Sequence, residues 1–510
     1  MLTKQLISLL QKAIQECYGQ HISVNEIHLS PVLKNLEGSH AVVLFPMAQR
    51  LKTSATSLGN RIGSWILVES DIVKSYQVIG GFLNLTLKDS AWLKALSSYK
   101  KRNLRVASPE KILAEISCPN TNKPWHLGHV RNTCVGDAVA NLLGAVGHEV
   151  KKVMHINDRG VHICKSILAY QHDVDASTPD EANKKGDHFV GDYYVKFNAQ
   201  YQKELAELPV EQRSSREATR NLPSMVAIQA MLRDWEAGDE GVRALWSRMN
   251  DWVLAGFKAT ADKLGFTFDL VYRESATYLR GKEMVLAGLK AGVFYQKEDQ
   301  SIWVDLEKEG FGQKLLLRGD GTTVYMTQDI GTAAIREEEW HANRSIYVVG
   351  NEQEYHFKVL FATLKKLGCP YANTLEHLSY GMVELPSGKM KSREGTIVDA
   401  DNLIDKMRCI AHKKMMSLGK VASLPKEKIT ELQDQIAIGA LKFFLLKVAP
   451  SKTIVFDPEK SIDFQGNTGS FIQYTHARIV SLLKKAPSPI SFSTSDCPYH
   501  LTASLEEIER

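Results

Sequence analysis

The sequence predicts an α/β protein whose centre is a parallel sheet, with an α+β segment before it and a helical segment after it. From residue 111 onward, short apolar runs alternate with amphipathic stretches, which is the pattern of parallel strands joined by helices. The sequence before residue 106 mixes one long helical pattern with short strand-like runs. Beyond residue 428 the apolar residues recur at helical spacing.

Composition restricts the class of protein. The chain has 510 residues, 44% hydrophobic and 24% charged, as expected for a globular protein of roughly two to four domains. Its formal charge of +5 suits a polyanionic partner without requiring one. Seven cysteines without a C-x-x-C pair argue against a disulfide framework and a thiolate zinc site, so we expect a cytoplasmic protein without bound zinc. We expect no membrane association, because no apolar run approaches the ~20 residues of a membrane span.

The first predicted domain covers residues 1–105. Leucine, isoleucine and alanine recur at helical spacing over residues 2–18, and Gly19 ends this helix. The basic stretch KKRNLR at 100–105 marks the boundary with the next domain. Strands are predicted at HAVVLF (40–45), SWILVES (64–70) and GGFLNLTL (80–87).

The second predicted domain covers residues 106–370. It starts with two buried strands, KILAEIS (111–117) and EVKKVMHI (149–156), each followed by a helix. Polar, helix-forming sequence at about 171–240 then interrupts the alternation, and a long helix at 241–264 resumes it. The simplest account is one sheet divided by a helical insertion. Further strands are predicted at FDLVY (268–272), IWVDL (302–306), KLLLR (314–318), TTVYM (322–326), RSIYVV (344–349) and HLSYGMVEL (377–385).

Residues 371–465 are predicted to contain a basic loop and connecting helices, with one helix after Asp399. The stretch GNTGSFIQYTHARIVSLLKK at 466–485 opens a helical bundle. Because the chain ends at Arg510, we expect residues 466–510 to form only part of such a bundle.

The stretch SCPNTNKPWHLGHVRN (117–132) lies between the first strand and the next helix. His126, Gly128 and His129 therefore stand at the sheet edge where α/β folds bind ligands, and at a helix N-terminus that favours phosphate. Gly128 permits close approach of a nucleotide, and imidazole N–H groups can donate to phosphate oxygens. Two alternatives remain at this point: a zinc site, which needs a third ligand, and histidines that only stabilise the helix.

The stretch GKMKSREGT (388–396) is a basic loop that follows a predicted strand. Its cations, including Lys389 and Arg393, suit the negative charge that develops on a leaving pyrophosphate. Taken alone, such a loop is usually solvated surface.

The HLGH sequence and the later K-M-x-x-R loop, in this order, resemble the HIGH and KMSKS signatures of class I aminoacyl-tRNA synthetases. The resemblance implies a Rossmann-like catalytic domain that uses ATP with Mg²⁺. Within that class, the neighbouring residues resemble arginyl-tRNA synthetases, with Cys118 in place of a serine. The segments YMTQD (325–329) and NEQEYH (351–356) are similar to two further elements of that family. The family's residues around HIGH are matched by Glu115, Asn120, Lys123, His126, Gly128 and His129.

This resemblance implies two sets of site residues. The catalytic set is His126, Gly128, His129, Lys123, Lys389 and Arg393. The arginine-binding set is Glu115, Cys118, Pro119, Asn120, His129, Tyr325, Asp329, Gln353 and Glu274. The resemblance implies that Asp329 and Glu115 receive the guanidinium and that Asn120 and Gln353 hold the α-groups of the amino acid. Ser392 stands where the KMSKS signature has its second lysine, and Lys123 or Lys391 is expected to supply the missing charge. As alternatives, Asp329 is a helix N-cap, Tyr325 a core residue and Glu274 a surface acid.

The resemblance also implies partners. Residues 1–105 are expected to bind the tRNA elbow, and residues 466–510 to begin the anticodon-binding domain. Arginine, ATP and tRNA(Arg) are then the substrates of arginine–tRNA ligation, and we expect a monomer. The alternatives are a synthetase of this class for another amino acid and a non-catalytic RNA-binding relative. The residues that would contact tRNA are Asn84, Asn467, Tyr474 and Arg478.

Overall fold

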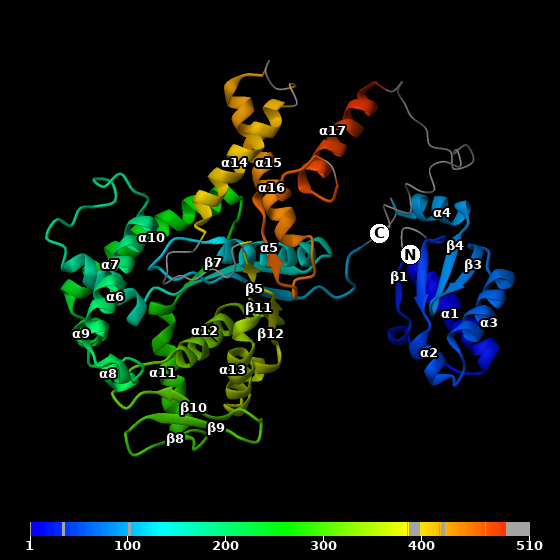
Figure 1. Cartoon of the computed structure of the whole chain (residues 1–510). Helices are drawn as coiled ribbons and strands as arrows, with labels where there is room; N and C mark the ends of the chain where they lie inside the picture. The colour runs from blue at the N-terminus through cyan, green and yellow to red at the C-terminus, as the bar shows by residue number, and fades with distance from the viewer. Residues whose placement is uncertain are drawn as a thin grey trace. The chain divides into compact units, whose positions relative to one another are not determined.

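The computed structural model describes residues 2–32, 36–99, 104–384, 386, 398–417, 419, 424–464 and 466–485 (Figure 1). The chain divides into two compact units, the first containing residues 1–104 and the second residues 105–484. Within the described ranges, no helix is both long and apolar enough to cross a lipid bilayer.

The first unit is an antiparallel sheet of four strands, in the order β1-β2-β4-β3, packed against helices. The predicted helix at 2–18 is confirmed as α1, whose apolar side Leu6, Leu10 and Ile14 is fully buried in the core. Its elements are α1 (Leu2–Tyr18), η1 (Val24–Glu26), β1 (Leu29–Pro31), β2 (His40–Val43), α2 (Phe45–Arg50), α3 (Ala55–Glu69), β3 (Val73–Ile79), β4 (Phe82–Leu87) and α4 (Asp89–Tyr99).

The strand predicted at SWILVES is wrong, because this stretch forms the second half of α3. The helix begins after Ser54, whose Oγ accepts a hydrogen bond from the backbone N–H of Ser57 at 3.1 Å. Leu58, Ile62 and Ile66 then lie four residues apart on one buried face. Packing of this face overrides the strand preference of the local apolar sequence.

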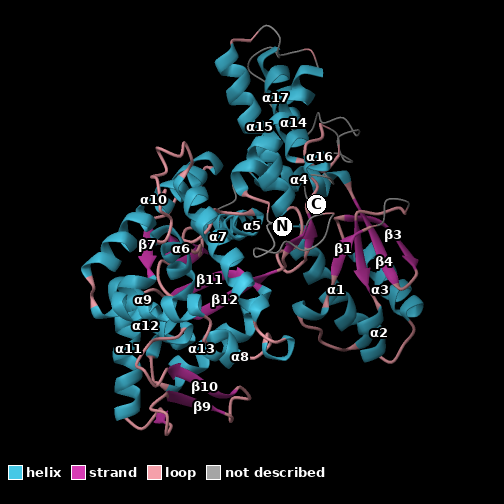
Figure 2. Cartoon of the chain, turned by 60° about the vertical axis from the view of Figure 1, so that its left-hand side comes forward, coloured by secondary structure: helices cyan, strands magenta, loops and turns pink. Residues whose placement is uncertain are grey.

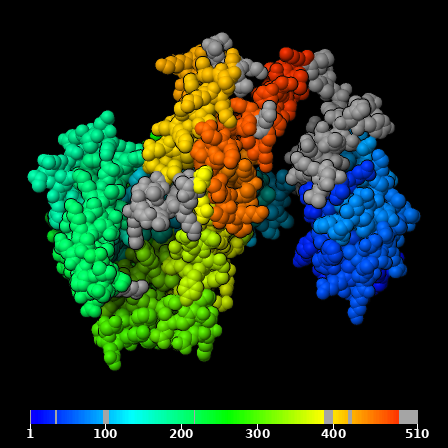
Figure 3. All heavy atoms as spheres, viewed as in Figure 1, coloured from blue at the N-terminus to red at the C-terminus, as the bar shows by residue number. Residues whose placement is uncertain are grey.

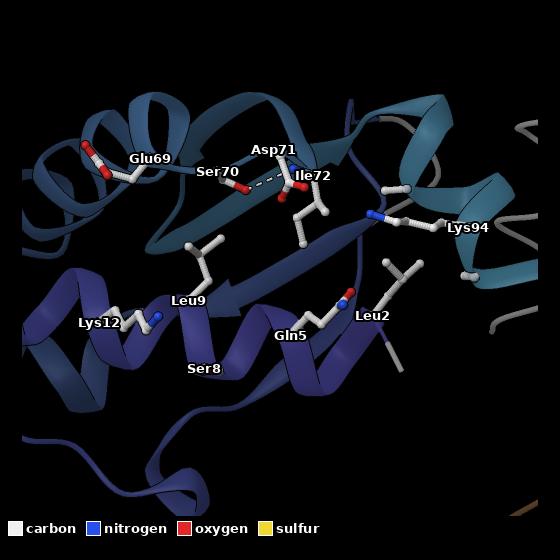
Figure 4. A pocket seen from close by; sticks show the side chains of 12 residues that line it. Leu2, Gln5, Ser8, Leu9, Lys12, Glu69, Ser70, Asp71, Ile72 and Lys94 are labelled. Carbon is white, nitrogen blue, oxygen red and sulfur yellow. Dashed lines mark hydrogen bonds between the residues drawn. The ribbon is translucent and has the colours of Figure 1, made fainter. Parts of the chain in front are cut away.

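A pocket of about 260 Å³ opens in the first unit between α1, the end of α3 and α4 (Figure 4). Lys12 of α1 and Lys94 of α4 line it together with the carboxylates Glu69 and Asp71. Its charges are therefore balanced, and it contains none of the residues that the sequence assigns to a site.

The second unit is built on a parallel sheet of five strands in the order β12-β11-β5-β6-β7. The strands predicted at 111–117 and 149–156 are confirmed as β5 (Lys111–Ser117) and β6 (Glu149–Ile156). The chain adds strands outward on one side of β5, first β6 and then β7, and then crosses to add β11 and β12 on the other side. The order in which strands are added across the sheet therefore reverses between β5 and β11, although the strands remain parallel. Ligands bind at the carboxyl ends of the strands beside such a reversal.

Helices cover the sheet and extend from it, as Figures 1 and 2 show. We use the name insertion for the helices from α7 to α10, which appear in sea green at the left of Figure 3; this set extends beyond the predicted 171–240 to include α10, the helix expected at 241–264 to resume the alternation. The elements around the sheet are α5 (Leu127–Ala145), α6 (Val161–Gln171), α7 (Gly186–Glu207), η2 (Val210–Gln212), α8 (Arg216–Arg220), α9 (Pro223–Ala237), α10 (Glu240–Leu264), β7 (Leu270–Arg273), α11 (Glu274–Lys290), α12 (Tyr325–Trp340), β11 (Arg344–Gly350), η3 (Asn351–Gln353), α13 (Glu354–Lys366), η4 (Pro370–Asn373) and β12 (Leu375–Tyr380).

Two predictions for residues 302–326 are corrected. The runs IWVDL and KLLLR do not join the parallel sheet, because β8 (Tyr295–Gln296), β9 (Ile302–Leu306) and β10 (Gly312–Leu317) form a separate antiparallel sheet. Figures 1 and 2 both show β9 and β10 apart from the central strands. TTVYM is not a strand, since α12 begins at Tyr325; Thr327 Oγ1 accepts a hydrogen bond from the backbone N–H of Val324 at 3.2 Å and caps this helix.

Helices α11 and α12 cross very closely. A Cβ atom on Gly281 would lie 1.9 Å from the backbone oxygen of Thr327, and one on Gly331 would lie 2.4 Å from that of Thr277. Only glycine therefore permits this crossing, which brings the first turns of both helices together. The chain continues through β13 (Val383–Glu384), α14 (Ala400–Ser417), α15 (Lys426–Leu446), β14 (Ile454–Val455), α16 (Pro458–Ser461) and α17 (Gly469–Lys485), with β13 and β14 paired in parallel.

Candidate active site

The HLGH turn is held by its own side chains at the start of α5. His126 is the N-cap residue, and its Nδ1 accepts a hydrogen bond from the backbone N–H of Gly128 at 3.1 Å. Nδ1 of His129 accepts one from the backbone N–H of His126 at 3.2 Å. The two rings stack with their centroids 3.8 Å apart. A Cβ on residue 128 would lie 2.9 Å from the His126 ring, so a larger residue would displace that ring.

These hydrogen bonds fix the tautomer of both rings. Because Nδ1 is an acceptor in each, the proton of each neutral imidazole is on Nε2. Burial, together with the charge of Lys123, lowers the pKa of His126 to about 3. Burial and the neighbouring His126 and Lys123 hold the pKa of His129 well below its ordinary value. Both rings are thus neutral Nε2–H donors at a helix N-terminus, the arrangement that receives phosphate oxygens.

The residues that begin α14 pair with this turn. The backbone N–H of Leu127 donates to the carbonyl oxygen of Val398 at 3.0 Å, and that of Ala400 donates to Trp125 at 2.9 Å. The two segments form an antiparallel bridge between His126 and Asp399. The predicted site residues Lys389 and Arg393, and the alternative cation Lys391, lie outside the described residues.

Glu274 is a buried acid at the first position of α11, with 2% of its surface exposed. Within the part of the chain that the structure describes, its Oε2 has no hydrogen-bond partner. Burial and the charges of Asp329 and Asp158 raise its pKa well above the ordinary value, although Arg159 acts in the opposite direction. The surface-acid alternative for Glu274 is therefore wrong, and a buried carboxyl without a partner is costly unless a ligand compensates for it.

Asp329 and Tyr325 lie on the first turns of α12, which crosses α11. Oδ2 of Asp329 is 2.6 Å from Nε2 of His356, on α13, and this hydrogen bond raises the pKa of His356 against the effect of burial. Partial burial and the charges of Glu274 and Asp329 raise the pKa of Tyr325. The N-cap alternative for Asp329 is wrong because α12 begins at Tyr325, and the core alternative for Tyr325 is wrong because it is 56% exposed.

Glu115 lies on β5 and is 4% exposed. Its Oε2 accepts a hydrogen bond from Nη2 of Arg336 at 2.6 Å, and Nδ1 of His155 is 3.8 Å from the same oxygen. The guanidinium of Arg336 lies 5.1 Å from the centroid of the Tyr272 ring and 5.4 Å from that of Tyr347. This buried ion pair holds one oxygen of the Glu115 carboxylate, Oε2, near the carboxyl end of β5.

The segment after β5 carries the remaining predicted residues. Sγ of Cys118 is 3.6 Å from Oδ1 of Asn132 on α5, and burial and nearby carboxylates raise its pKa to about 12. Pro119 accepts a backbone hydrogen bond from Asn157 at 3.0 Å, and Asn120 forms a bridge with the same residue. Gln353 is exposed at the start of α13, after β11. Cys118 and Gln353 thus follow the two strands on either side of the reversal point, β5 and β11, whereas Pro119 and Asn120 pair with the residue that follows β6.

The residues assigned to tRNA lie far from this edge in the sequence. Asn84 lies on β4 of the first unit and is 2% exposed, so it is the least accessible of the four. Asn467 is exposed. On α17, Nη1 of Arg478 donates to the hydroxyl of Tyr474 at 3.1 Å, and both residues are exposed.

Asp158 and Arg336 are absent from the sequence-predicted set. Asp158 is fully buried and accepts hydrogen bonds from the backbone N–H of Ser275 at 2.8 Å and from its hydroxyl at 2.7 Å. It therefore fixes the first turn of α11 and with it Glu274. The signal for Asp158 was present, because it follows β6 as Cys118 follows β5. Arg336 has no such signal, since it pairs with a residue 221 positions away.

The parallel sheet, its reversal point and the HLGH turn define a class I aminoacyl-tRNA synthetase fold. The family model described as "tRNA synthetases class I (R), catalytic domain" matches residues 93–457. The chain belongs to this family, the arginine–tRNA ligases.

Relatives and solved structures agree with this assignment. An arginine–tRNA ligase of Amoebophilus asiaticus is 50% identical over 93% of this chain and 80% of its own length. One of Bacteroides fragilis is 47% identical over 94% of this chain and 82% of its own length. The fold is similar to that of the Thermus thermophilus arginyl-tRNA synthetase, with a TM-score of 0.73 at 24% identity over 100% of this chain and 86% of that one. These relatives favour neither a synthetase for another amino acid nor a non-catalytic RNA-binding protein.

Proposed function

We propose that this chain activates L-arginine with ATP, giving arginyl-adenylate and pyrophosphate, and then transfers arginine to the 3′-terminal adenosine of tRNA(Arg). The observation that carries this proposal is the unpartnered, buried carboxyl of Glu274 beside Asp329, at the same sheet edge as the HLGH turn. An acidic pocket suits a guanidinium, and neutral N–H donors at a helix N-terminus suit phosphate.

In the arginine subsite, we assign protein residues to each charged group of the substrate. Asp329 and Glu274 receive the guanidinium, whose planar fork pairs with carboxylates through two parallel hydrogen bonds. Tyr325 lies over the side chain at the entrance. Glu115, which the sequence resemblance assigns to the guanidinium, is proposed here to receive the α-ammonium through Oε1 instead, because Arg336 and His155 approach the other oxygen of that carboxylate. Cys118, Pro119, Asn120 and Gln353 bound the α-carbon end.

The reaction needs no protein nucleophile. A carboxylate oxygen of arginine attacks the α-phosphorus of ATP, and the bond to the bridging oxygen breaks to release pyrophosphate. The Nε2–H groups of His126 and His129 donate to the phosphates as their charge increases, and Lys123 adds a positive charge. In the second step a ribose hydroxyl of tRNA attacks the arginyl carbonyl, and AMP leaves. Mg²⁺ enters as the magnesium complex of ATP.

The remaining assignments complete the proposal. Lys389 and Arg393 would act on the departing pyrophosphate. The first unit would bind the tRNA elbow near Asn84, and α17 would contact tRNA through Tyr474 and Arg478, together with Asn467. The enzyme would act as a monomer and without bound zinc.

The test is ATP–pyrophosphate exchange with each of the twenty amino acids, with and without tRNA. Exchange that depends on arginine alone is the expected result. Exchange with another amino acid would overturn the assignment of the pocket. An effect of tRNA on the rate would show that this chain binds tRNA productively.

The raised pKa of Glu274 makes arginine binding pH-dependent. The guanidinium pairs with the ionised carboxylate, so binding must release the proton that the buried group holds in the free enzyme. The KM for arginine is therefore expected to fall as pH rises through the raised pKa and to level off above it. Measurement from about pH 6 to 9 checks this, because arginine's own guanidinium stays charged throughout. Glu274→Gln should raise the KM and remove its pH dependence; an unchanged profile in this variant would exclude Glu274 as the titrating group.

A further inference from the structure

A partly buried ionic cluster lies where α7 and α10 of the insertion meet the start of α14. Nζ of Lys185 is 3.0 Å from Asp187 and 2.6 Å from Asp401, and Nζ of Lys263 is 2.7 Å from the other oxygen of Asp401. Nε2 of His188 is 3.3 Å from both Asp401 and Asp399. We call this set the Asp401 cluster: Lys185, Asp187, His188, Lys263, Asp399 and Asp401.

Both oxygens of Asp401 are paired without a metal ion, whereas Oδ2 of Asp399 has no hydrogen-bond partner among the described residues. Asp187, His188 and Asp401 are metal-ligand types whose atoms lie within 4.8 Å of one another. However, two ammonium groups already contact these carboxylates, and the hydrogen bond that His188 donates to Asp401 raises the pKa of His188. Three acids thus face two lysines and a readily protonated histidine. Their hydrogen bonds lower the pKa of Asp401 despite its burial, as expected for a satisfied ion-pair network.

Asp399 and Asp401 flank the residue that holds the HLGH turn. Ala400 lies between them, is fully buried and donates its backbone N–H to Trp125. Asp399 is the bridge partner of His126. The side chains at 399 and 401 thus attach this short backbone segment to the insertion, and its backbone attaches to the turn.

The insertion also supports the turn from within the core. The buried ring of Trp125 has its centroid 6.1 Å from that of Phe257 on α10 and 6.4 Å from that of His129. Helix α7 lies against α10 so closely that a Cβ on Gly256 would be 2.4 Å from Asp187. Both histidines of the turn are therefore bounded by groups that the insertion holds.

We propose that the Asp401 cluster positions the HLGH turn, so that the insertion sets where the Nε2–H groups of His126 and His129 meet ATP. This inference rests on the proposed role of HLGH in ATP binding. Lys185, His188, Lys263, Asp399 and Asp401 are positioning residues, since none of them touches the reacting atoms. Their effect is expected mainly on the ATP side, because Glu274 and Asp329, the acids proposed for the guanidinium, lie on α11 and α12.

The kinetic test compares wild type with Asp401→Asn and with Lys263→Met, the mildest change because Lys263 is partly exposed. We expect the KM for ATP in pyrophosphate exchange to rise by about tenfold in Asp401→Asn, as a displacement well under 1 Å would cause, with the KM for arginine unchanged. Lys185→Arg should keep more activity than Lys185→Met. The matched control is Lys184→Met, at the residue next to Lys185 in the sequence. It removes the exposed ion pair between Lys184 and Asp192 and should change neither KM. Equal rises of both KM values, or none, would overturn the inference.

A second measurement does not depend on catalysis. Hydrogen exchange of peptides that contain Leu127 and Ala400 should be faster in Asp401→Asn than in wild type or Lys184→Met. Unchanged exchange there would overturn the inference even if activity fell. Failure of wild type to exchange pyrophosphate would count against the proposed function, and the hydrogen-exchange result would still decide the role of the cluster.

Discussion

Asp329→Asn is expected to lower kcat/KM for arginine in ATP–pyrophosphate exchange by about 10²- to 10³-fold, the usual loss when one partner of a desolvated charge pair is removed. The asparagine keeps the shape of the side chain, but it loses the charge and turns an N–H₂ group toward the guanidinium. Glu274 alone would then face the substrate's charge. The KM for ATP should stay near the wild-type value.

Citrulline makes this test specific for charge, because it replaces the guanidinium with a neutral urea of almost the same shape. Wild type should strongly prefer arginine, and Asp329→Asn should lose most of that preference. The matched control is Glu354→Gln on α13, which removes an exposed carboxylate 2.7 Å from Lys358 and should leave kcat/KM unchanged. If Asp329→Asn discriminated against citrulline as well as wild type does, Asp329 would not be the guanidinium partner.

The pair formed by Asp329 and His356 shows why only part of the site follows from sequence. Each residue lies near a strand end or helix start, where a polar side chain is expected at a ligand-binding edge. Their hydrogen bond depends on the crossing of α11, α12 and α13, which a linear pattern does not contain. The same holds for Glu274, because its burial results from Gly281 and Gly331 at the helix crossing.

The fold, like the site, was predictable from the sequence only in part. The strands β5 and β6 were predictable because short stretches rich in apolar residues that alternate with helical patterns are typical of parallel strands joined by helices. SWILVES and TTVYM were misassigned because helix caps at Ser54 and Thr327, and packing of the helices they begin, override local strand preference. The separate sheet β8–β10 was missed because the sequence of an apolar run does not reveal its partner strand.

His129→Asn is expected to lower kcat for adenylate formation by about 10²- to 10³-fold, the usual loss of one donor to a developing oxyanion. Asparagine places an oxygen where Nδ1 stands, so it can still accept the backbone N–H of His126 and keep the turn. It has no donor in place of Nε2–H. His129→Gln extends an amide N–H₂ toward the Nε2 position and should be about tenfold more active than His129→Asn.

The two variants separate phosphate binding from a structural role of the histidine. If His129 only stabilised α5, His129→Asn would be at least as active as His129→Gln, because asparagine keeps the acceptor within the turn. If His129 binds phosphate, His129→Gln is the more active variant, while the melting temperature and tRNA affinity of His129→Asn stay at wild-type values.

The pH profile adds an independent check. Burial keeps the pKa of His126 near 3 and that of His129 well below its ordinary value, so these two imidazoles should contribute no ionisation to wild-type kcat between about pH 6 and 8. A profile that required protonation of His126 or His129 would contradict the neutral-donor mechanism, because the hydrogen bond to Nδ1 of that ring would then have to break.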